Sequence, residues 1–297
     1  MSAPIFESST EDIPAVKIVI AIPARIGSTR LPRKPLVPLG GMPLIKHVAS
    51  RVAECISELS NQLSIPDSEI TSCVATDSPD VQNALSSSGI MTIMTSAALA
   101  SGTDRIQAAL ESLEKTRLKL SASTLVINLQ GDEPFFCVND IVNLIKGMQN
   151  EPHCPMGTLA FSQSSVQSFL RTSTVKVTRN NLGQALYFSR APIAWPRETW
   201  GASGLIYDLS DKMKTSAPIS FLQHVGIYAY RWSSLKQFTS MPQSSLELRE
   251  GLEQLRALEA GWAIKVVDAQ EAPFGIDTAE DLLRAEAHLI QNKGKRS

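Results

Sequence analysis

The chain has 297 residues, 43% of them hydrophobic, with a formal net charge of -1 and a pI near 6.4. A chain of this length can bury a sizeable core, and its near-neutral charge gives no broad basic surface for binding nucleic acid. The four cysteines lie far apart without CxxC or metal-ligand spacing, which argues against a disulfide framework or structural zinc and favours a reducing, cytoplasmic location.

Residues 1–16 contain acidic side chains and no signal-peptide pattern, and no apolar run approaches the ~20 residues of a membrane span. We therefore expect a protein without a membrane span, with a flexible N-terminal extension over 1–16 and a single domain over 17–297.

Short β-branched runs alternate with segments of helical periodicity in the first half of the chain. This alternation predicts an α/β fold with a mainly parallel sheet wrapped by helices. The expected strands span 17–22, 70–76, 90–94 and 124–130, and the expected helices span 43–58, 78–88, 103–116 and 138–149.

The pattern changes after residue 155. Extended runs at 157–162, 174–179, 184–189 and 224–230, with a turn signal at 180–183, predict antiparallel additions or a hairpin. Helical periodicity returns at 244–260 and 278–290. Two spans of low hydrophobicity, 57–69 and 197–216, are expected to be surface loops.

The segment IPARIGSTRLPRKPLVPLGGMPLIKHV (22–48) joins the first predicted strand to the first predicted helix and carries the clearest chemical signal. Its cations, Arg25, Arg30, Arg33 and Lys34, lie at a strand's carboxyl end, where open α/β sheets bind ligands. Several cations that converge there would suit a polyanion such as a triphosphate. The loop lacks both GxxxxGK[ST] and GxGxxG, so side chains must hold the phosphates. The alternative is a solvated basic turn before an amphipathic helix.

The order of residues in this loop, PARxGSTRLPxKPLxxxxGxPLIxH, resembles that of sugar-nucleotide pyrophosphorylases and cytidylyltransferases. From about Lys17 to about Leu289 the chain resembles the 3-deoxy-manno-octulosonate cytidylyltransferase (CMP-Kdo synthetase) family more narrowly. The other matching segments are VATDSPDV (74–81), MTSAALASGTDRI (94–106), VINLQGDEPF (126–135), VKVTRNNLGQALYFSRAPIAW (175–195), QHVGIYAYR (223–231), SSLELREGLEQLRALEAG (244–261) and GIDTAEDL (275–282).

The resemblance implies a three-layer α/β fold with a mixed, mainly parallel sheet of the nucleotide-diphospho-sugar transferase (Rossmann-like) type. It also implies transfer of CMP from CTP to the anomeric hydroxyl of 3-deoxy-D-manno-octulosonate (Kdo), for lipopolysaccharide or a related polysaccharide, by a Mg²⁺-dependent homodimer.

Two aspartates are the expected metal ligands. Asp132 follows an apolar strand, and Asp277 follows the run AIKVVDA and precedes a helix. Mg²⁺ is often held by one or two carboxylates together with substrate phosphate. For Asp277 the alternative is a helix N-cap, because Asp-Thr-Ala-Glu is a good capping sequence. The resemblance makes Asp132 and Asp277, with Lys34 and Arg30, the expected catalytic residues.

The resemblance implies that Arg25, Arg30 and Lys34 contact the phosphates. Arg33 departs from the family, where glycine is common before the lysine, and it could simply point to solvent. The loops after the second and third strands would bind cytosine and ribose, although both also read as helix starts. The remaining nucleotide candidates are Ala75, Thr76, Asp77, Ser101, Gly102 and Thr103, and Asp104 replaces the usual glutamate.

On the acceptor side, the bidentate fork of Arg190 suits a sugar carboxylate, and several polar residues suit the hydroxyls. Taken singly, His224 and Tyr228 are more often core residues, and Glu253 is more often a solvated helix residue. Their occurrence within HVGIYAYR and LEQLR favours the sugar site. The expected sugar-binding residues are Gln130, Arg190, His224, Tyr228, Glu253 and Gln254.

The sequence leaves other functions open. The acceptor could be an amino-deoxy Kdo or a sialic-type acid, and UTP could replace CTP, since single contacts decide such preferences. A catalytically inactive nucleotide-binding homologue is a further alternative, although Lys34, Asp132 and Asp277 are all retained. APFGIDTAED also lacks one glycine that is common before the second aspartate.

Overall fold

The structure is a computed structural model that describes residues 15–28, 30–197 and 219–293. At its centre is one mixed sheet in the strand order β11-β7-β10-β6-β1-β4-β5, with β8 and β9 attached beside β10. β1 pairs in parallel with β4 and β6, β4 with β5, and β11 with β7, whereas β10 runs antiparallel to both β6 and β7. The strands are β1 (Ala15–Ala24), β4 (Ile70–Thr76), β5 (Met91–Met94), β6 (Lys119–Asn128), β7 (Met156–Gln163), β8 (Lys176–Arg179), β9 (Ala185–Ser189), β10 (Phe221–Arg231) and β11 (Ile264–Ala269), with a separate pair β2 (Pro38–Leu39) and β3 (Met42–Pro43).

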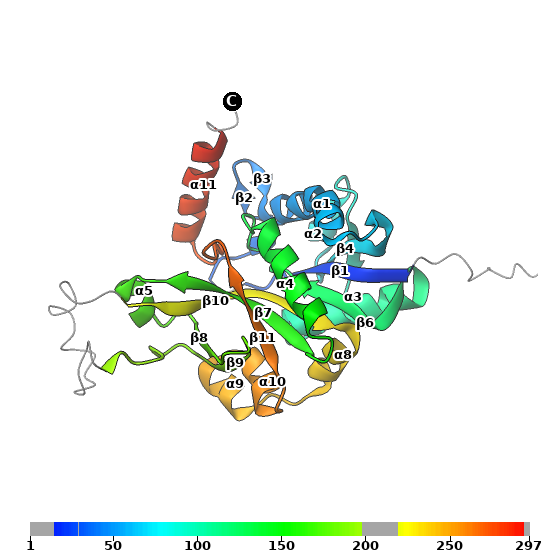
Figure 1. Cartoon of the computed structure of the whole chain (residues 1–297). Helices are drawn as coiled ribbons and strands as arrows, with labels where there is room; N and C mark the ends of the chain where they lie inside the picture. The colour runs from blue at the N-terminus through cyan, green and yellow to red at the C-terminus, as the bar shows by residue number, and fades with distance from the viewer. Residues whose placement is uncertain (1–14, 29, 198–218, 294–297) are drawn as a thin grey trace, which may run out of the picture.

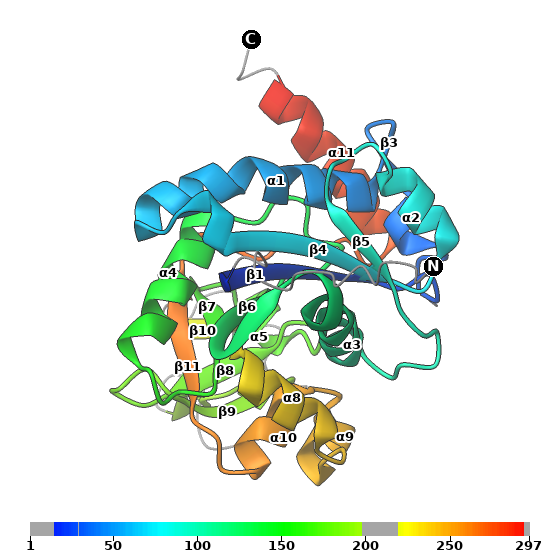
Figure 2. The same cartoon turned by 90° about the vertical axis from the view of Figure 1, so that its right-hand side faces the viewer.

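Helices cover both faces of the sheet. Figure 2 shows α1 on one side of β1 and β4, and α3 and α8 on the other side. The helices are α1 (Leu44–Leu63), α2 (Pro79–Leu85), α3 (Gly102–Thr116), α4 (Val138–Asn150), α5 (Val166–Leu170), α8 (Trp232–Ser240), α9 (Ser245–Glu250), α10 (Gln254–Glu259) and α11 (Ala279–Lys293), with short 3-10 turns η2 (Lys34–Leu36) and η3 (Asp67–Glu69).

The strand β1 shows why the fold has three layers. Ile18, Ile20 and Ile22 belong to the hydrophobic cluster that also contains the buried faces of α1 and α4. Val19 and Ala21 point to the opposite face, in the cluster with residues of α3 and α8. Because successive side chains of a strand alternate between faces, an uninterrupted apolar run belongs in a sheet covered on both sides. The predicted three-layer fold is confirmed.

The parallel pairing brings distant loops to one edge of the sheet. β1, β4 and β6 run side by side in the same direction, so the loops that follow Ala24, Thr76 and Asn128 emerge together. The antiparallel β10 passes this edge with a register shift between Val225 and Tyr228, which places an irregular segment beside the end of β6. α11 stands away from the sheet in Figure 1, and its first residues approach the same edge.

The predicted hairpin is present as the antiparallel pair β8 and β9, but several other expectations need correction. The segment 57–69 is not a loop, because α1 continues to Leu63 and buries Leu59 completely. Residues 244–260 form two helices, α9 and α10, separated at Gly251. The strand β1 begins at Ala15, two residues before the expected start of the first strand. Residues 1–14 lie outside the described residues, and so do residues 198–218, which include nearly all of the second expected loop.

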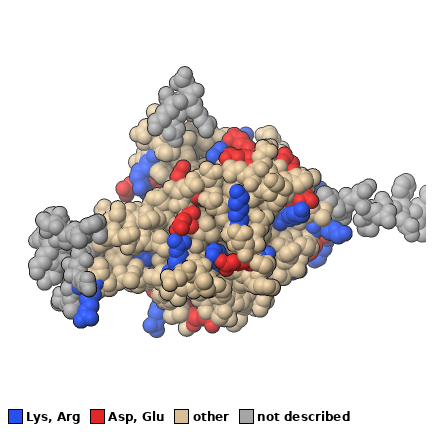
Figure 3. Space-filling model, viewed as in Figure 1, with Lys and Arg blue, Asp and Glu red and all other residues tan. Residues whose placement is uncertain are grey.

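The charged side chains are distributed over the surface. On the face shown in Figure 3, the described lysines and arginines lie among aspartates and glutamates. No helix in the described part of the chain is long and apolar enough to cross a membrane.

Candidate active site

Two cations and two carboxylates meet at the edge where β1 and β6 end. Lys34 Nζ donates a hydrogen bond to Asp132 Oδ2 and another, 2.8 Å long, to Asp277 Oδ1. Arg30 Nη2 lies 3.1 Å from Asp277 Oδ2. The four residues expected to be catalytic are therefore neighbours, although Lys34 contacts the carboxylates in this structure.

Local sequence explains how each side chain reaches this point. Arg33 adopts a left-handed conformation with φ 54°, directly before the turn η2 that carries Lys34. Gly131 precedes Asp132 where a Cβ would come within 2.8 Å of the Pro23 carbonyl oxygen, so a glycine is needed for this close approach. Arg33 itself pairs with Asp80 at 2.7 Å on the exposed surface.

Asp277 is not the cap of α11. The Thr278 hydroxyl accepts a hydrogen bond from the backbone N–H of Asp281 at 3.2 Å, and the Asp281 carboxylate accepts from the backbone N–H groups of Asp277 and Thr278. Thr278 and Asp281 thus form the capping box. The Asp277 carboxylate is left to bind Lys34 and Arg30, which removes the capping alternative raised by the sequence.

Charge and burial shift the pKa values in this cluster. Burial alone would lower the pKa of Lys34, but the Asp132 and Asp277 carboxylates outweigh it and raise the pKa above its usual value. Burial, together with repulsion from Asp132 and Asp277, raises the pKa of Glu133 to about 8. Lys34 therefore stays cationic, and Glu133 is mostly protonated at neutral pH.

The chemistry of the donor set can be tested against a divalent cation. Asp132 and Asp277 contact the same ammonium group, so their oxygens already define one cation-sized position. Among the described residues, no group of three or more His, Cys, Asp or Glu side chains could hold a metal alone. Two carboxylates completed by substrate oxygens and water fit Mg²⁺, which is commonly held in this way.

The end of β4 and the residue that follows it form buried contacts next to the site. Ala75 and Thr76 are fully buried, and the Thr76 carbonyl accepts hydrogen bonds from the hydroxyl and backbone N–H of Thr95. Asp77 Oδ2 accepts from Arg105 at 3.0 Å, while Asp77 Oδ1 accepts from the backbone N–H of Ile26 at 3.1 Å. Asp77 therefore holds the cation-bearing loop against α3.

The second predicted nucleotide loop begins α3. Ser101 is its N-cap, and Asp104 completes a capping box by accepting from the Ser101 backbone N–H at 3.0 Å. Gly102 lies against Pro23, whose ring would be 3.1 Å from an added Cβ. Thr103 donates from Oγ1 to Glu253 Oε2 at 2.8 Å. A residue predicted to bind the nucleotide is thus hydrogen-bonded to a residue predicted to bind the sugar.

The predicted sugar residues gather around the register shift in β10. Tyr228 donates from its hydroxyl to Gln254 Oε1 at 3.1 Å, and Gln130 Nε2 donates to the Gly226 carbonyl at 3.4 Å. His224 Nε2 lies 3.0 Å from Thr158 Oγ1. Burial lowers the pKa of His224 to about 3, so its imidazole is neutral.

The charges of nearby carboxyl groups affect Tyr228. Burial raises the pKa of Tyr228 first, and the nearby carboxyl groups of Glu253 and Glu133 raise it further. The phenol hydroxyl is therefore a hydrogen-bond donor at neutral pH. Gln254 Nε2 is buried without a hydrogen-bond partner among the described residues.

Arg190 is held differently from the other predicted sugar residues. Its Nε donates to the Glu250 carbonyl at 2.7 Å, and its two Nη atoms donate to the Thr172 and Gly251 carbonyls at 3.2 and 3.3 Å. These bonds fix the guanidinium beside the turn between α9 and α10. Arg190 thus stabilises the turn between α9 and α10, and none of these hydrogen bonds joins it to Tyr228, Gln130 or Gln254.

Sequence reasoning missed several buried charged residues behind the site. Arg105 is 2% exposed, and Lys176 is fully buried, where Nζ donates to the Arg171, Thr174 and Arg190 carbonyls. Burial lowers the pKa of Lys176 to about 8. Arg105 lies on the same helix face as the buried Ile106 and Ala109, so a charge at a position expected to be buried was the available signal.

Comparison with known proteins supplies an independent line of information. The Cytidylyltransferase family profile matches residues 18–267. The chain is 41% identical over 274 residues to a 3-deoxy-manno-octulosonate cytidylyltransferase of Xanthomonas campestris pv. campestris (strain 8004), covering 91% of this chain and 99% of that protein.

Two further relatives agree with it. A protein of the same name from Stenotrophomonas maltophilia (strain K279a) is 41% identical over 283 residues, covering 94% of this chain and 99% of that protein. A solved structure of CMP:2-keto-3-deoxy-manno-octonic acid synthetase complexed with CTP superimposes with a TM-score of 0.73 at 37% identity, covering 93% of this chain and 99% of that chain.

Proposed function

Because this chain belongs to the cytidylyltransferase family, we propose that it transfers CMP from CTP to the anomeric hydroxyl of 3-deoxy-D-manno-octulosonate and releases pyrophosphate. The relatives named for this reaction match nearly the whole chain, and the solved relative holds CTP. The observation in this structure that carries the proposal is the meeting of Arg30 and Lys34 with Asp132 and Asp277 at one strand edge.

In the proposed reaction, Arg30 and Lys34 bind the triphosphate and offset the charge that develops on the leaving pyrophosphate. Arg25, which is exposed at the end of β1, adds a third cation to this loop. No covalent intermediate is needed, because phosphoryl transfer depends mainly on in-line positioning and charge stabilisation. The Asp77 and Arg105 pair contributes by keeping the loop that bears these cations in place.

Asp132 and Asp277 would hold Mg²⁺ when substrate is present. The ion would supply a Lewis acid that polarises the phosphate and lowers the pKa of the acceptor hydroxyl. The two aspartates would bind and orient it, and the Lys34 ammonium, which contacts both carboxylates here, would bind a phosphate oxygen instead.

The acceptor sugar would bind where Gln130, Tyr228, Glu253 and Gln254 converge. Neutral phenol and carboxamide groups suit hydroxyl recognition, and the Glu253 carboxyl group offers oxygens that accept hydrogen bonds. The hydrogen bond from Thr103 to Glu253 supports an acceptor site beside the proposed nucleotide loop. Arg190 uses three of its five N–H donors on backbone carbonyls, so each Nη atom keeps one N–H that could bind the sugar carboxylate.

The proposal is tested by measuring pyrophosphate release with CTP, Mg²⁺ and Kdo, beside a panel with UTP, an amino-deoxy Kdo and a sialic acid. We expect the highest kcat/KM with CTP and Kdo. Folded protein that releases no pyrophosphate with any pair would refute the activity, and a better turnover with another pair would change the substrate.

Asp132→Asn tests the role of the carboxylate cluster. We expect a rate loss of ~100-fold or more, because one of the two carboxylates that would hold Mg²⁺ at the reacting centre is neutralised. Asp268→Asn is the matched control, since Asp268 pairs with Arg179 on the exposed surface at 2.6 Å, far along the sheet in β11. A rate in D132N equal to that of D268N would remove Asp132 from the mechanism.

We further propose that the enzyme acts in the cytoplasm as a homodimer and serves lipopolysaccharide synthesis. Light scattering on the full chain tests the dimer, and a mass equal to one chain would refute it.

A further inference from the structure

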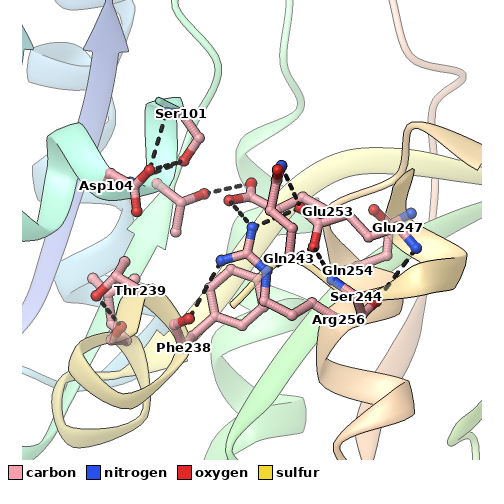
Figure 4. Close-up of polar contacts among 12 residues, drawn as sticks. Ser101, Asp104, Phe238, Thr239, Gln243, Ser244, Glu247, Glu253, Gln254 and Arg256 are labelled. Carbon is pink, nitrogen blue, oxygen red and sulfur yellow. Dashed lines mark hydrogen bonds and ion pairs between the residues drawn. The ribbon is translucent and has the colours of Figure 1, made fainter. Parts of the chain in front are cut away.

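A buried ion pair lies behind the proposed acceptor site, between α9 and α10. Arg256 and Glu247 are each 7% exposed, and the Arg256 fork donates from Nε and Nη2 to the two Glu247 carboxylate oxygens at 2.8 and 2.6 Å. The guanidinium also lies 4.7 Å from the ring centroid of Phe238. Figure 4 shows this group, with Arg256 between Glu247 and Glu253. The fork is therefore fixed in position and plane.

The same guanidinium faces Glu253. Arg256 Nη2 lies 3.7 Å from Glu253 Oε1, and the other oxygen of Glu253 accepts the 2.8 Å bond from Thr103. Glu253 Oε1 is buried and has no hydrogen bond among the described residues. One carboxylate thus spans the gap between α10 and the nucleotide loop, with a fixed cation on one side and a hydroxyl donor on the other.

We propose that Arg256, anchored by Glu247, is a positioning residue that orients Glu253 toward Thr103 and the acceptor sugar. The inference rests on the proposed function and adds a residue to it. Arg256 is itself too buried to be a substrate ligand in this structure, so it acts through Glu253.

Electrostatics supports this role for Arg256. Burial raises the pKa of Glu253, whereas the hydrogen bond from Thr103 and the charge of Arg256 oppose the rise, and the charge of Asp104 adds to it. The other titratable groups facing Glu253 are the phenols of Tyr228 and Tyr230 on β10, which remain protonated because burial raises their pKa values. Removing the guanidinium would leave the half-buried Glu253 carboxyl group without its neighbouring cation, which favours the protonated form of Glu253.

A double-mutant cycle on the full-length enzyme tests the proposal. The first change is E247M/R256M, which removes both buried charges together and keeps apolar volume against Phe238, because a lone buried charge would destabilise the fold. We expect the KM for the sugar acid to rise about tenfold with kcat nearly unchanged, as for loss of a group that binds substrate and transition state equally. The acidic limb of kcat/KM should move to higher pH.

The second change is E253Q, alone and combined with E247M/R256M. If Arg256 acts through Glu253, the triple variant has the same sugar-acid KM as E253Q, and its pH profile does not move further. Multiplicative effects on KM would overturn the proposal. R256K, which keeps the cation but loses the fork, gives a second cycle with E253Q in case the double variant does not fold, and we expect a smaller rise in KM.

R231M is the matched control for loss of a partly buried arginine. Arg231 donates to the Cys154, Met148 and Glu151 carbonyls, none of which belongs to the proposed site. We expect this variant to lose stability in urea and to keep the sugar-acid KM. A KM rise in R231M as large as that in E247M/R256M would overturn a specific role for Arg256. A wild type without turnover would instead refute the proposed function.

Discussion

Asp77 and Asp80 are three residues apart, yet their surroundings differ completely. The pair of Asp77 with Arg105 is buried, with side chains 8% and 2% exposed, whereas Asp80 and Arg33 are 56% and 61% exposed. A buried charge that loses its partner retains its desolvation cost, while an exposed pair is screened by water. The two aspartates therefore allow a matched comparison.

We expect Asp77→Asn to lower the free energy of unfolding by about 3–5 kcal/mol, because Arg105 would remain buried without a counter-charge. The variant Asp80→Asn should change it by less than about 1 kcal/mol. Urea denaturation of the two variants at one pH measures both values. Similar losses in the two variants would contradict the structural role given to Asp77.

His224 should make stability depend on pH in a defined window. Burial lowers its folded pKa to about 3, below the value near 6.5 of an unfolded histidine. Above pH ~6.5 the imidazole is neutral in both states and contributes no pH dependence. As pH falls from there toward 3, the unfolded state binds the proton first, so the folded state loses stability by up to about 1.4 kcal/mol per pH unit.

The measurement compares wild type with His224→Gln by urea denaturation between pH 7.5 and 4.5. Other groups titrate in both proteins, so only the difference between the two curves reports on His224. We expect that difference to be flat above pH 6.5 and to move against the wild type below it. Parallel curves throughout would show that His224 is not buried in its neutral form.

At the residue scale, the family resemblance predicted that Asp132 and Asp277 share one site, but it assigned Lys34 to the phosphates. In the structure Lys34 contacts both carboxylates, although Lys34 and Asp277 are 243 positions apart. The partners behind the site could not be predicted in the same way. The local sequence around Asp77 predicts only the start of a helix. It does not reveal that Arg105 donates a hydrogen bond to Asp77 Oδ2, because this buried pair depends on how α3 packs against β4.

At the scale of elements, the break between α9 and α10 shows how one residue divides a helix. The apolar spacing over 244–260 predicts one helix, but Gly251 is the C-cap of α9 with φ 61°. The backbone then turns, and this turn brings the Glu250 and Gly251 carbonyls to Arg190. A left-handed cap costs little for glycine and more for a residue with a Cβ.

We expect Gly251→Ala to lower the free energy of unfolding by about 1 kcal/mol, because alanine is strained in the left-handed region. Gly275→Ala is the control, since its Cβ would meet nothing within 4 Å and its φ is not in that region. Chemical denaturation compares them. An equal effect at both positions would mean that the conformation of Gly251 does not limit stability.

At the end of α1, the predicted helix is shorter than the observed one. Residues 57–69 are polar enough to suggest a loop, but the spacing of Val52, Cys55 and Leu59 keeps one face of the helix buried as far as Leu59, and α1 continues to Leu63. A polar outer face is normal for a helix on the surface of a three-layer fold. The low average hydrophobicity of this segment suggested a loop, whereas the spacing of its apolar residues indicates a helix.

At the scale of the whole molecule, the proposed site joins segments from nearly the full length of the chain. Lys34 follows β1, Asp132 follows β6, Glu253 precedes α10 and Asp277 precedes α11. The alternation of strands and helices predicted the sheet, and parallel pairing placed the loops at one edge. The antiparallel insertion of β10 between β6 and β7 could not be derived from periodicity, because pairing partners are set by tertiary packing.

Ligand binding at a site built from such distant segments should stabilise the entire fold. A ligand that binds only the folded state adds about 2.7 kcal/mol at one hundred times its Kd, so CTP with Mg²⁺ should raise Tm clearly. We expect CTP with a chelator to raise it much less, because the carboxylates of Asp132 and Asp277 would then face the triphosphate without a bridging cation.

Differential scanning fluorimetry over a range of CTP concentrations, with Mg²⁺ or with EDTA, measures these shifts. In Asp277→Asn the Mg²⁺-dependent part of the shift should disappear, since one of the two proposed ligands is lost, while the control Asp268→Asn should keep it. Asp277 also pairs with Arg30 and Lys34, so the variant's own Tm without ligand is its baseline. A shift of equal size with EDTA in the wild type would separate nucleotide binding from the carboxylate pair and contradict the proposed metal role.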